Sequence, residues 1–192
     1  MSLVSDEQLM LDYGQRGDSA AFDRLYQRYR QPLFAFICQK MPEAACNEVF
    51  QEVWESIISQ ASAYQLPSEK NRDNSASTTR HFRGYLYTIA RRRVADYWRS
   101  KDRHEDHPEQ DVDQLHSRST PELEHQQAVD QQAILGCVSL LPAKQQDVFM
   151  LKQSGLAVAE MSQVLDASFD AIKSRIRVAY QQLRDCLEKH HG

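Results

Sequence analysis

Apolar residues recur at helical spacing through most of the first hundred positions. The widest stripe consists of Phe22, Leu25, Tyr26, Tyr29, Leu33, Phe36 and Ile37. This spacing places the side chains on one face of an α-helix, which runs through Pro32 without losing its pattern. Gly17 closes the helix before it, and Asp18 is placed to cap it. Shorter stripes predict three more helices, over about 6–16, 44–59 and 81–100. Together the four predict a small helical domain.

The last third of the chain predicts a helix-turn-helix. Helical character resumes near Glu122, and Pro142 opens a further helix through Lys152. Two helices then follow, over about 157–164 and 169–188, separated only by Leu165, Asp166, Ala167 and Ser168. Two helices joined by so short a turn, after another helix, are typical of a helix-turn-helix. The Ser168 hydroxyl is suited to cap the second helix.

Two stretches have no apolar period. Residues 65–79 are rich in Ser, Asn, Lys and Pro, and residues 101–121 consist largely of His, Asp, Glu, Gln and Ser. Such segments cannot bury a core, so we predict a long loop and a flexible acidic linker. The expected architecture is therefore all-α, with a first domain over 1–100, a linker over 101–121 and a second domain over 122–192.

Composition favours a soluble, cytoplasmic protein. The chain has 192 residues, of which 41% are hydrophobic and 26% charged, with a mean hydropathy of -0.64. No run approaches the ~20 apolar residues of a membrane-spanning helix, and the N-terminus lacks the segments of a signal peptide. Four widely spaced cysteines form no C-x-x-C pair, so we expect buried free thiols. These are Cys38, Cys46, Cys137 and Cys186.

Charge is distributed unevenly behind the net value of -4. Residues 80–103 carry eight basic and two acidic side chains, whereas residues 104–130 carry one basic and eight acidic side chains. A compact basic block beside an acidic one suggests a nucleic-acid contact next to a solvated connector.

The helix over 169–188 has a polar side suited to DNA. Successive residues of an α-helix are rotated by 100° about its axis, so one narrow arc, which must face the core, holds Ile172, Ile176, Ala179 and Leu183. Its far side carries Lys173, Ser174, Arg177 and Gln181. Arginine and lysine can read guanine or clamp phosphate. A solvated polar face on an ordinary helical hairpin is an equally good reading of this helix alone.

Two separate groups of motifs resemble one family. Residues 140–184 contain Leu-Pro-x-x-x-Gln, a later Gly, and Ile172, Lys173, Ser174 and Arg175 in place of a Val-Lys-Ser-Arg core. This resembles domain four of the extracytoplasmic-function (group 4) sigma factors of the bacterial sigma-70 family. The segments GDSAAFDRLYQRYRQPLFAF, EVFQEVWESI and FRGYLYTIARRRVADYWR are similar to its domain two.

The resemblance implies a dissociable initiation subunit that binds core RNA polymerase, recognises a promoter and helps to open it. Its implied partners are the beta-prime clamp helices and beta flap of the polymerase, promoter DNA and an anti-sigma factor, with no membrane insertion and no cofactor. The acidic-x-x-Gln-Glu-x-aromatic segment that docks on the clamp helices corresponds to Glu48, Gln51, Glu52 and Trp54. Taken alone, these residues fit a solvated face on a core helix better.

The fourth helix corresponds to the family's minus-ten element helix. A basic face there can hold the non-template strand while bases leave the stack. The DNA-binding residues implied are Tyr87, Arg91, Arg92, Trp98 and Arg99. We expect Tyr85 to belong to the core, and Tyr87 and Trp98 fit either a core or a stacking role.

The minus-thirty-five element is expected to contact Lys173, Ser174, Arg175 and Arg177. Arg175 lies at the edge of the buried arc, where it can reach a phosphate instead of a base. The chain departs from the family's usual residues at Asp166, Ser162 and the Asp170-Ala171 pair. The loop between Trp54 and Phe82 is also longer than is usual in the family. The promoter sequence that this chain recognises therefore cannot be inferred from the family.

Other functions find less support. The linker histidines, His104, His107, His116 and His125, have no spacing typical of metal ligands, so we expect no metal site. No nucleotide-binding, zinc-protease or serine-hydrolase motif occurs, and we expect no enzymatic activity. The serious alternative is an autonomous helix-turn-helix regulator that never joins the polymerase. A protein-interaction adaptor would need no exposed basic helix.

Overall fold

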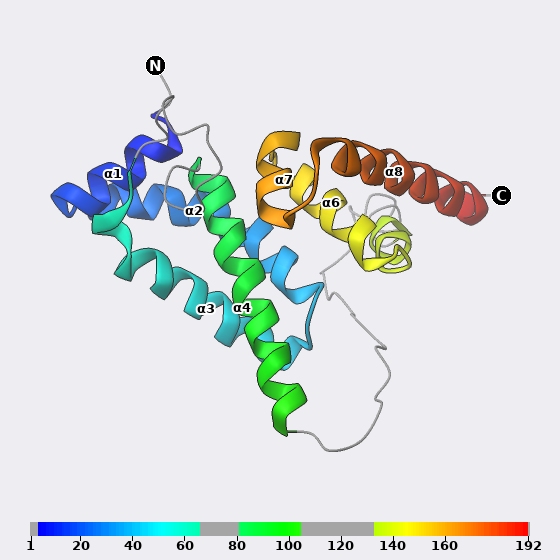
Figure 1. The fold of residues 1–192 in the computed structure, drawn as a ribbon, viewed down its shortest axis with the longest axis horizontal. Helices are drawn as coiled ribbons and strands as arrows, with labels where there is room; N and C mark the ends of the chain where they lie inside the picture. Colours follow the sequence, from blue (N-terminus) through cyan, green and yellow to red (C-terminus); the bar gives the residue numbers. More distant parts are fainter. Residues whose placement is uncertain (1–3, 66–80, 105–132, 192) are drawn as a thin grey trace, which may run out of the picture. The chain divides into compact units, whose positions relative to one another are not determined.

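The computed structural model describes residues 4–65, 81–104 and 133–191, and every regular element in these ranges is a helix. The chain divides into two compact units, residues 1–108 and 109–192 (Figure 1). The all-α, two-unit prediction is confirmed. All of the predicted loop except Gln65, nearly all of the acidic linker and the predicted start of the second domain over 122–132 lie outside the described residues.

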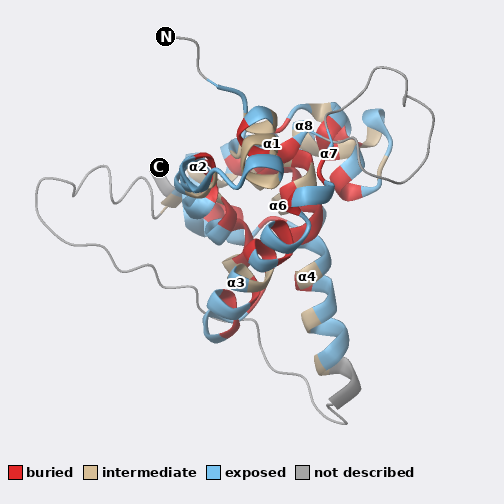
Figure 2. Ribbon diagram, turned by 90° about the vertical axis from the view of Figure 1, so that its left-hand side faces the viewer, coloured by how far each residue is buried: buried red, intermediate tan, exposed pale blue. Residues whose placement is uncertain are grey.

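Within its described residues, unit 1 has four α-helices and a short 3-10 helix. They are α1 (Asp6–Arg16), α2 (Ser19–Cys38), α3 (Glu43–Ser59), η1 (Ala61–Ala63) and α4 (Phe82–His104). The predicted aromatic stripe of α2 lies against α1, α3 and α4, with Leu25, Leu33, Phe36 and Ile37 fully buried. Figure 2 shows buried and exposed residues on opposite sides of these helices. The core of unit 1 therefore centres on α2.

Local hydrogen bonds set the helix boundaries that the sequence predicted. The Ser5 hydroxyl accepts a bond from the N–H of Gln8 at the start of α1. Gly17 ends that helix with φ = 68°, in the left-handed region that glycine adopts without strain. The Asp18 carboxylate then accepts from two N–H groups at the start of α2, as predicted.

Helix α4 is longer than predicted, because it runs to His104 rather than about Ser100. Residues 101–104 therefore belong to the helix and not to the linker. Leu86, Ile89, Ala90 and Val94 are buried as expected, but from Ala95 to Ser100 most side chains are exposed. Between Ala95 and Lys101 α4 thus continues without a buried side chain, so no apolar period marks where it ends.

Unit 2 is built around its C-terminal helix. A helical segment over 133–139 leads through Pro142 into α6 (Ala143–Gln153), followed by α7 (Val158–Leu165) and α8 (Phe169–His191). Helices α6 and α7 both pack on α8 and on each other. The fully buried side chains of this core include Val148, Leu151, Leu156, Met161, Ile172 and Ala179. The helix-turn-helix prediction is confirmed within one residue at each facing end.

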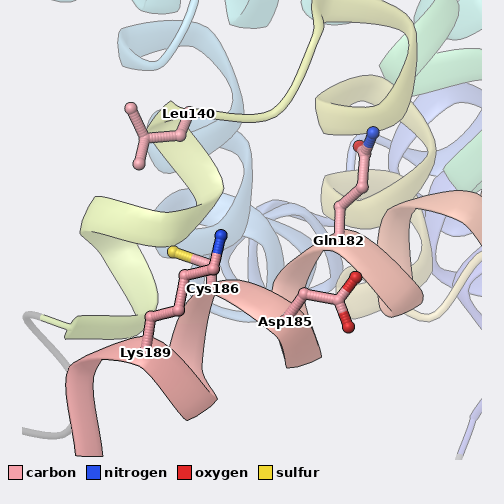
Figure 3. Close-up of a pocket in the computed structure, with 5 residues that line it drawn as sticks. All are labelled: Leu140, Gln182, Asp185, Cys186 and Lys189. Carbon is pink, nitrogen blue, oxygen red and sulfur yellow. The ribbon is translucent and has the colours of Figure 1, made fainter. Parts of the chain in front are cut away.

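An open pocket lies on the surface of unit 2 beside the C-terminal half of α8. Gln182, Asp185, Cys186 and Lys189 project from α8, and Leu140 faces them from the end of the 133–139 segment (Figure 3). The pocket has a volume of about 390 Å³. It is small and mostly apolar, with charged groups only from α8.

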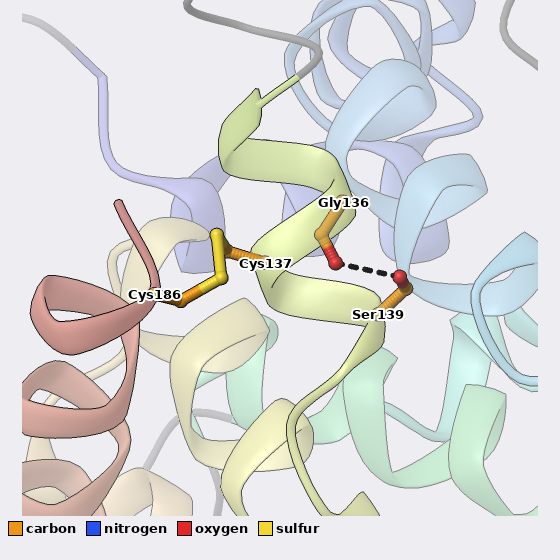
Figure 4. The surroundings of a disulfide bond; sticks show 4 residues. All are labelled: Gly136, Cys137, Ser139 and Cys186. Carbon is orange, nitrogen blue, oxygen red and sulfur yellow. Dashed lines mark hydrogen bonds between the residues drawn. A yellow bond between two sulfur atoms is a disulfide. The ribbon is translucent and has the colours of Figure 1, made fainter. Parts of the chain in front are cut away.

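The cysteine prediction is wrong for two of the four residues. Cys137 and Cys186 form a disulfide with Cα atoms 5.9 Å apart, which joins the 133–139 segment to α8 (Figure 4). The partners are 49 residues apart in sequence, so spacing alone gave no sign of their proximity. Cys38 and Cys46 are free thiols, as predicted, but only Cys46 is buried, whereas Cys38 is half-buried.

Candidate functional site

Helix α3 presents a polar edge opposite its buried face. Val49, Val53 and Ile57 point into the core, and the side chains of Glu48 and Gln51 are exposed on the other side. This follows from helical spacing, because residues 48 and 51 share a face that the apolar positions avoid. The structure therefore brings these two predicted polymerase-binding residues together on one accessible surface.

Glu52 lies at the border between this edge and α4. Its side chain is about 40% exposed, and a carboxylate oxygen lies 3.9 Å from the guanidinium of Arg93. Arg93 also donates a 2.8 Å hydrogen bond to the hydroxyl of Ser56. One residue of the basic block is thus used to hold α4 against α3, a role that the sequence analysis did not foresee.

Trp54 does not lie on the polar edge, which corrects its predicted place in the polymerase-binding set. The side chain is only 5% exposed. Its ring packs between α2 and α3, with centroids 5.6 Å from Phe22 and 5.1 Å from Tyr26. Residue 54 lies four positions after Phe50 and three before Ile57, so it shares the buried side of the helix with them and not the exposed edge.

Arg91 and Arg92 form the centre of an exposed basic surface on α4. Further along the helix, Arg99 donates a 2.6 Å bond to Asp96, and both side chains are at least half exposed. Such exposed pairs are weak and easily exchanged for a phosphate. The surface formed by Arg91, Arg92 and Arg99, here called the α4 basic surface, is therefore able to contact an anionic polymer.

The aromatic residues of α4 divide into core and surface. Tyr87 is fully buried, with its ring perpendicular to that of Phe36 at 5.2 Å, so of the core and stacking roles that the sequence left open, the structure favours the core. Tyr85 is half-buried and donates a 3.0 Å hydrogen bond to Gln60.

Trp98 is the exposed aromatic of the three. It is 39% exposed, and its indole N–H donates a 3.0 Å bond to the backbone carbonyl of Lys40 at the end of α2. This bond fixes the indole beside the α4 basic surface. A fixed, partly exposed ring next to cationic side chains is the arrangement on which single-stranded bases stack.

The predicted DNA-contacting residues of unit 2 lie near the start of α8. Lys173, Ser174 and Arg177 are exposed, whereas Arg175 is half-buried at the edge of the core face. The structure thus brings the four predicted minus-thirty-five residues onto one helix, with Arg175 least accessible. We call Lys173, Ser174 and Arg177 the α8 polar surface.

The turn before α8 fixes the direction of this helix. Asp166 adopts φ = 49°, a left-handed conformation that aspartate tolerates better than most residues. The Ser168 hydroxyl accepts a 3.3 Å bond from the N–H of Ala171, which confirms the predicted cap. At the start of α7, Glu160 accepts a 2.7 Å bond from the N–H of Ala157.

Phe169 is a surface residue that the sequence analysis treated only as a helix start. It is 46% exposed, and the ammonium of Lys173 lies 4.5 Å from its ring centroid. This cation–π contact restrains Lys173 at the edge of the α8 polar surface. The signal was present in the sequence, because position 169 lies outside the arc of Ile172, Ala179 and Leu183.

The described residues offer little support for other kinds of site. Among the described residues, no group of three or more His, Cys, Asp or Glu side chains is arranged to hold a metal ion. Of the predicted linker histidines, His107, His116 and His125 lie outside these residues, and the side chain of His104 is not described. None of the described helices is long and apolar enough to cross a membrane.

Comparison with known proteins shows the family to which the chain belongs. The family model for ECF sigma factors matches residues 5–189. The ECF RNA polymerase sigma factor BldN of Streptomyces coelicolor is 26% identical over 168 residues, which cover 86% of this chain. The match covers 60% of BldN, so the chain spans less than two thirds of the length of this relative.

Two solved structures share the fold. The sigma factor RpoE of Bartonella quintana, in complex with the anti-sigma factor NepR, matches with a TM-score of 0.63 and 17% identity, over 87% of this chain and 96% of that one. CnrH, in complex with the cytosolic domain of CnrY, matches with a TM-score of 0.60 and 17% identity, over 96% and 98%.

Proposed function

Because the chain belongs to the ECF sigma factor family, we propose that it is a dissociable specificity subunit of RNA polymerase. In this role it binds core polymerase, recognises the minus-thirty-five and minus-ten elements of a promoter and promotes DNA opening. The observation that carries the proposal is that the family match extends over both units. A helix-turn-helix regulator outside the polymerase would need only unit 2.

Unit 1 is proposed to bind the polymerase through the polar edge of α3. Glu48 and Gln51 are the exposed groups there, and Glu52 contributes from the border. An exposed acidic edge beside an apolar core suits docking on a complementary basic surface, since electrostatic matching sets orientation and partner choice. The clamp helices of the beta-prime subunit are the proposed partner.

The α4 basic surface is proposed to hold the non-template strand of the minus-ten element. Arg91, Arg92 and Arg99 would contact phosphates, and Trp98 would stack on a base. Because α3 and α4 pack side by side in unit 1, polymerase docking and strand binding are assigned to two faces of the same small domain (Figure 1).

The α8 polar surface is proposed to read the minus-thirty-five element in the major groove. The N-terminal residues of a recognition helix contact base edges, and Lys173, Ser174 and Arg177 lie within its first nine positions. Arg175, half-buried, is assigned to a phosphate. Unit 2 thus takes the proposed role of domain four. Its proposed contact on the polymerase is the beta flap.

The remaining parts of the proposal concern regulation and place. An anti-sigma factor is proposed to cover the polymerase-binding faces; the RpoE relative was solved with such a partner. The chain is proposed to act in the cytoplasm, without membrane insertion and without catalysing a reaction itself, because it works as a binding subunit of another enzyme.

Run-off transcription from a promoter library, with purified core polymerase, tests the proposed function. Defined start sites are expected only when the protein is added, and the aligned promoters then supply the recognition sequence. If core polymerase gains no specificity while the protein binds duplex DNA alone with a steep salt dependence, the autonomous-regulator alternative replaces this proposal.

A division of labour between the two faces of unit 1 is expected in the same system. Changing Arg91 and Arg92 to Ala should reduce promoter opening by roughly tenfold or more with little effect on core binding. Changing Glu48 and Gln51 to Ala should weaken core binding instead. Permanganate footprinting measures opening, and fluorescence anisotropy with labelled protein measures core binding. Equal losses in both assays for both pairs would contradict the division.

A further inference from the structure

The two sulfur atoms of the unit 2 disulfide have different surroundings. Cys137 is 1% exposed and lies within the core. Cys186 is partly exposed and forms part of the wall of the surface pocket (Figure 3). A solute that enters the pocket can therefore approach Cys186, whereas Cys137 can be reached only from Cys186.

The pocket offers groups for a small charged molecule. Lys189 supplies an ammonium, Asp185 a carboxylate and Gln182 an amide, all from α8 (Figure 3). Leu140, 75% exposed, supplies an apolar wall opposite them. A peptide-like thiol or disulfide carries carboxylates, an amino group and a sulfur on a short chain, and so matches these groups.

The proposed function gives this bond a physiological meaning. A polymerase subunit acts where the cell keeps thiols reduced, and disulfides in such compartments are usually transient and redox-sensing. We propose that Cys137 and Cys186 form a reversible thiol–disulfide site, which a low-molecular-weight peptidic disulfide oxidises through Cys186. This inference rests on the proposed function only for the cellular compartment.

Oxidation of the cysteine pair needs two thiol–disulfide exchange steps and no reactant other than the small disulfide. The thiolate of Cys186 attacks one sulfur of the small disulfide, whose S–S bond breaks and releases one thiol after protonation. Cys137 then loses its proton and attacks the sulfur of Cys186, which releases the second thiol. Two electrons pass from the cysteine pair to the small disulfide, and an excess of the small thiol reverses both steps.

The free cysteines of unit 1 are not part of this site. Burial raises the pKa of the Cys38 thiol, and its hydrogen bond with Cys46 raises it further. Burial likewise raises the pKa of the Cys46 thiol, which donates to the backbone carbonyl of Pro42 at 3.5 Å. Thiols held protonated react slowly with disulfides, so these two residues provide an internal control.

Equilibration of the full chain with reduced and oxidised glutathione tests the proposal directly. Acid quenching, alkylation under denaturing conditions and mass spectrometry then give the oxidation state of each cysteine. Cys137 and Cys186 are expected to change together from thiols to disulfide as the oxidised fraction rises, while Cys38 and Cys46 remain thiols. A pair that stays fully oxidised in excess reduced glutathione, or never closes in excess oxidised glutathione, would overturn the proposal.

A charge reversal tests the role of the pocket. Lys189→Glu should slow oxidation by glutathione disulfide several-fold but leave the rate with uncharged hydroxyethyl disulfide unchanged. The matched control is Lys152→Glu, which makes the same change at an exposed position on α6. An equal effect of both variants, or none from Lys189→Glu, would show that the pocket does not select the oxidant.

These measurements use the protein alone, so they stand apart from the transcription assay. If start sites appear with core polymerase but the cysteine pair does not exchange, the redox inference fails and the proposed function stands. If the pair exchanges but core polymerase gains no specificity, the proposed function fails while the thiol–disulfide chemistry remains.

Discussion

The Glu7 carboxylate links the first helix of unit 1 to the last. It accepts a 3.2 Å hydrogen bond from the N–H of Phe82, at the start of α4, and lies 3.2 Å from Nδ1 of His81. Partial burial acts to raise the pKa of Glu7, but the bonds from its own N–H, from Phe82 and from His81 outweigh this and lower it. The ionised carboxylate is thus the stabilising form.

The first prediction concerns acid stability. Because the folded-state pKa of Glu7 lies below its ordinary value of 4.5, its contribution is present above that value and is lost as pH falls through the folded pKa. Glu7→Gln should therefore lower the stability of unit 1 near neutral pH, and the difference from wild type should shrink in acid. Urea unfolding at a series of pH values measures this. Glu55→Gln, which removes an exposed charge from the same unit, is the control; a constant difference for Glu7→Gln would contradict the assignment.

Single residues also show where sequence reasoning succeeds. The polar positions Glu48, Gln51, Lys173 and Arg177 were placed correctly on exposed faces, because helical periodicity alone decides which side of a buried stripe they occupy. Trp54 was misplaced, and Tyr87 was left open between core and surface, because motif matching identifies a position without its orientation. In both cases a large ring fills space between helices, and burial outweighs any surface role.

Helix α1 and the 3-10 helix η1 are in direct backbone contact. A Cβ added at Gly14 would lie 2.1 Å from the carbonyl oxygen of Ala61 and 2.7 Å from its carbon. No side chain fits there without moving η1. Gly14 is therefore required by the approach of two elements and not by the conformation of its own helix.

The second prediction compares two glycine substitutions in helices. Gly14→Ala should destabilise unit 1 by about 1–3 kcal/mol, because the clash exceeds the gain in helix propensity. Gly136→Ala is the matched control: apart from its chain neighbours and the backbone of its own helix, no atom of the described residues lies within 4 Å of the added Cβ, so unit 2 should gain up to about 1 kcal/mol. Chemical denaturation of each variant measures both changes. Stabilisation by Gly14→Ala would contradict the close approach.

The third prediction concerns the recognition helix. Lys173→Ala and Arg177→Ala should each weaken binding of the polymerase complex to a minus-thirty-five element by about 1–3 kcal/mol, because they remove contacts in the major groove. Arg175→Ala should change the salt dependence more than the sequence preference. Competition binding on matched and mutated promoters measures these effects. Lys152→Ala on α6 serves as the control, and equal losses for all four variants would contradict the proposed surface.

Predicted helix boundaries agree closely with the observed ones where a capping residue or the end of an apolar stripe marks the helix end. The predicted ends of α1 at Arg16 and α3 at Ser59 agree with the structure, and α7 is displaced by one residue. The end of α4 was missed because no side chain from Ala95 to Lys101 is buried and no glycine follows closely, so neither periodicity nor a terminating residue marks it. Polar helices of this kind are the hardest to delimit from sequence.

At the scale of the whole molecule, the two units differ in how they are held together. Unit 1 depends on its apolar core, whereas unit 2 also has a covalent bond across a separation of 49 residues. The sequence predicted two domains from the break in apolar periodicity, but it could not predict this bond, because no local pattern links positions 137 and 186.

The fourth prediction follows from this difference. Reduction of the Cys137–Cys186 bond should destabilise unit 2 by about 4 kcal/mol or less, since the bond restricts the unfolded chain, and should leave unit 1 unchanged. Thermal unfolding with and without reductant measures the effect, with a Cys137→Ser/Cys186→Ser variant expected to match the reduced wild type. A Cys38→Ser variant is the control. Equal shifts in both units would show that they do not unfold independently.

The placement of the tryptophans makes the molecule its own optical reporter. The sequence contains two tryptophans, and both belong to unit 1: Trp54 in the core and Trp98 beside the α4 basic surface. Indole emission therefore follows unit 1 alone, while far-ultraviolet circular dichroism follows the helices of both units. In a single sample, quenching of Trp98 would signal strand capture, and a dichroic transition without an emission change would mark the unfolding of unit 2.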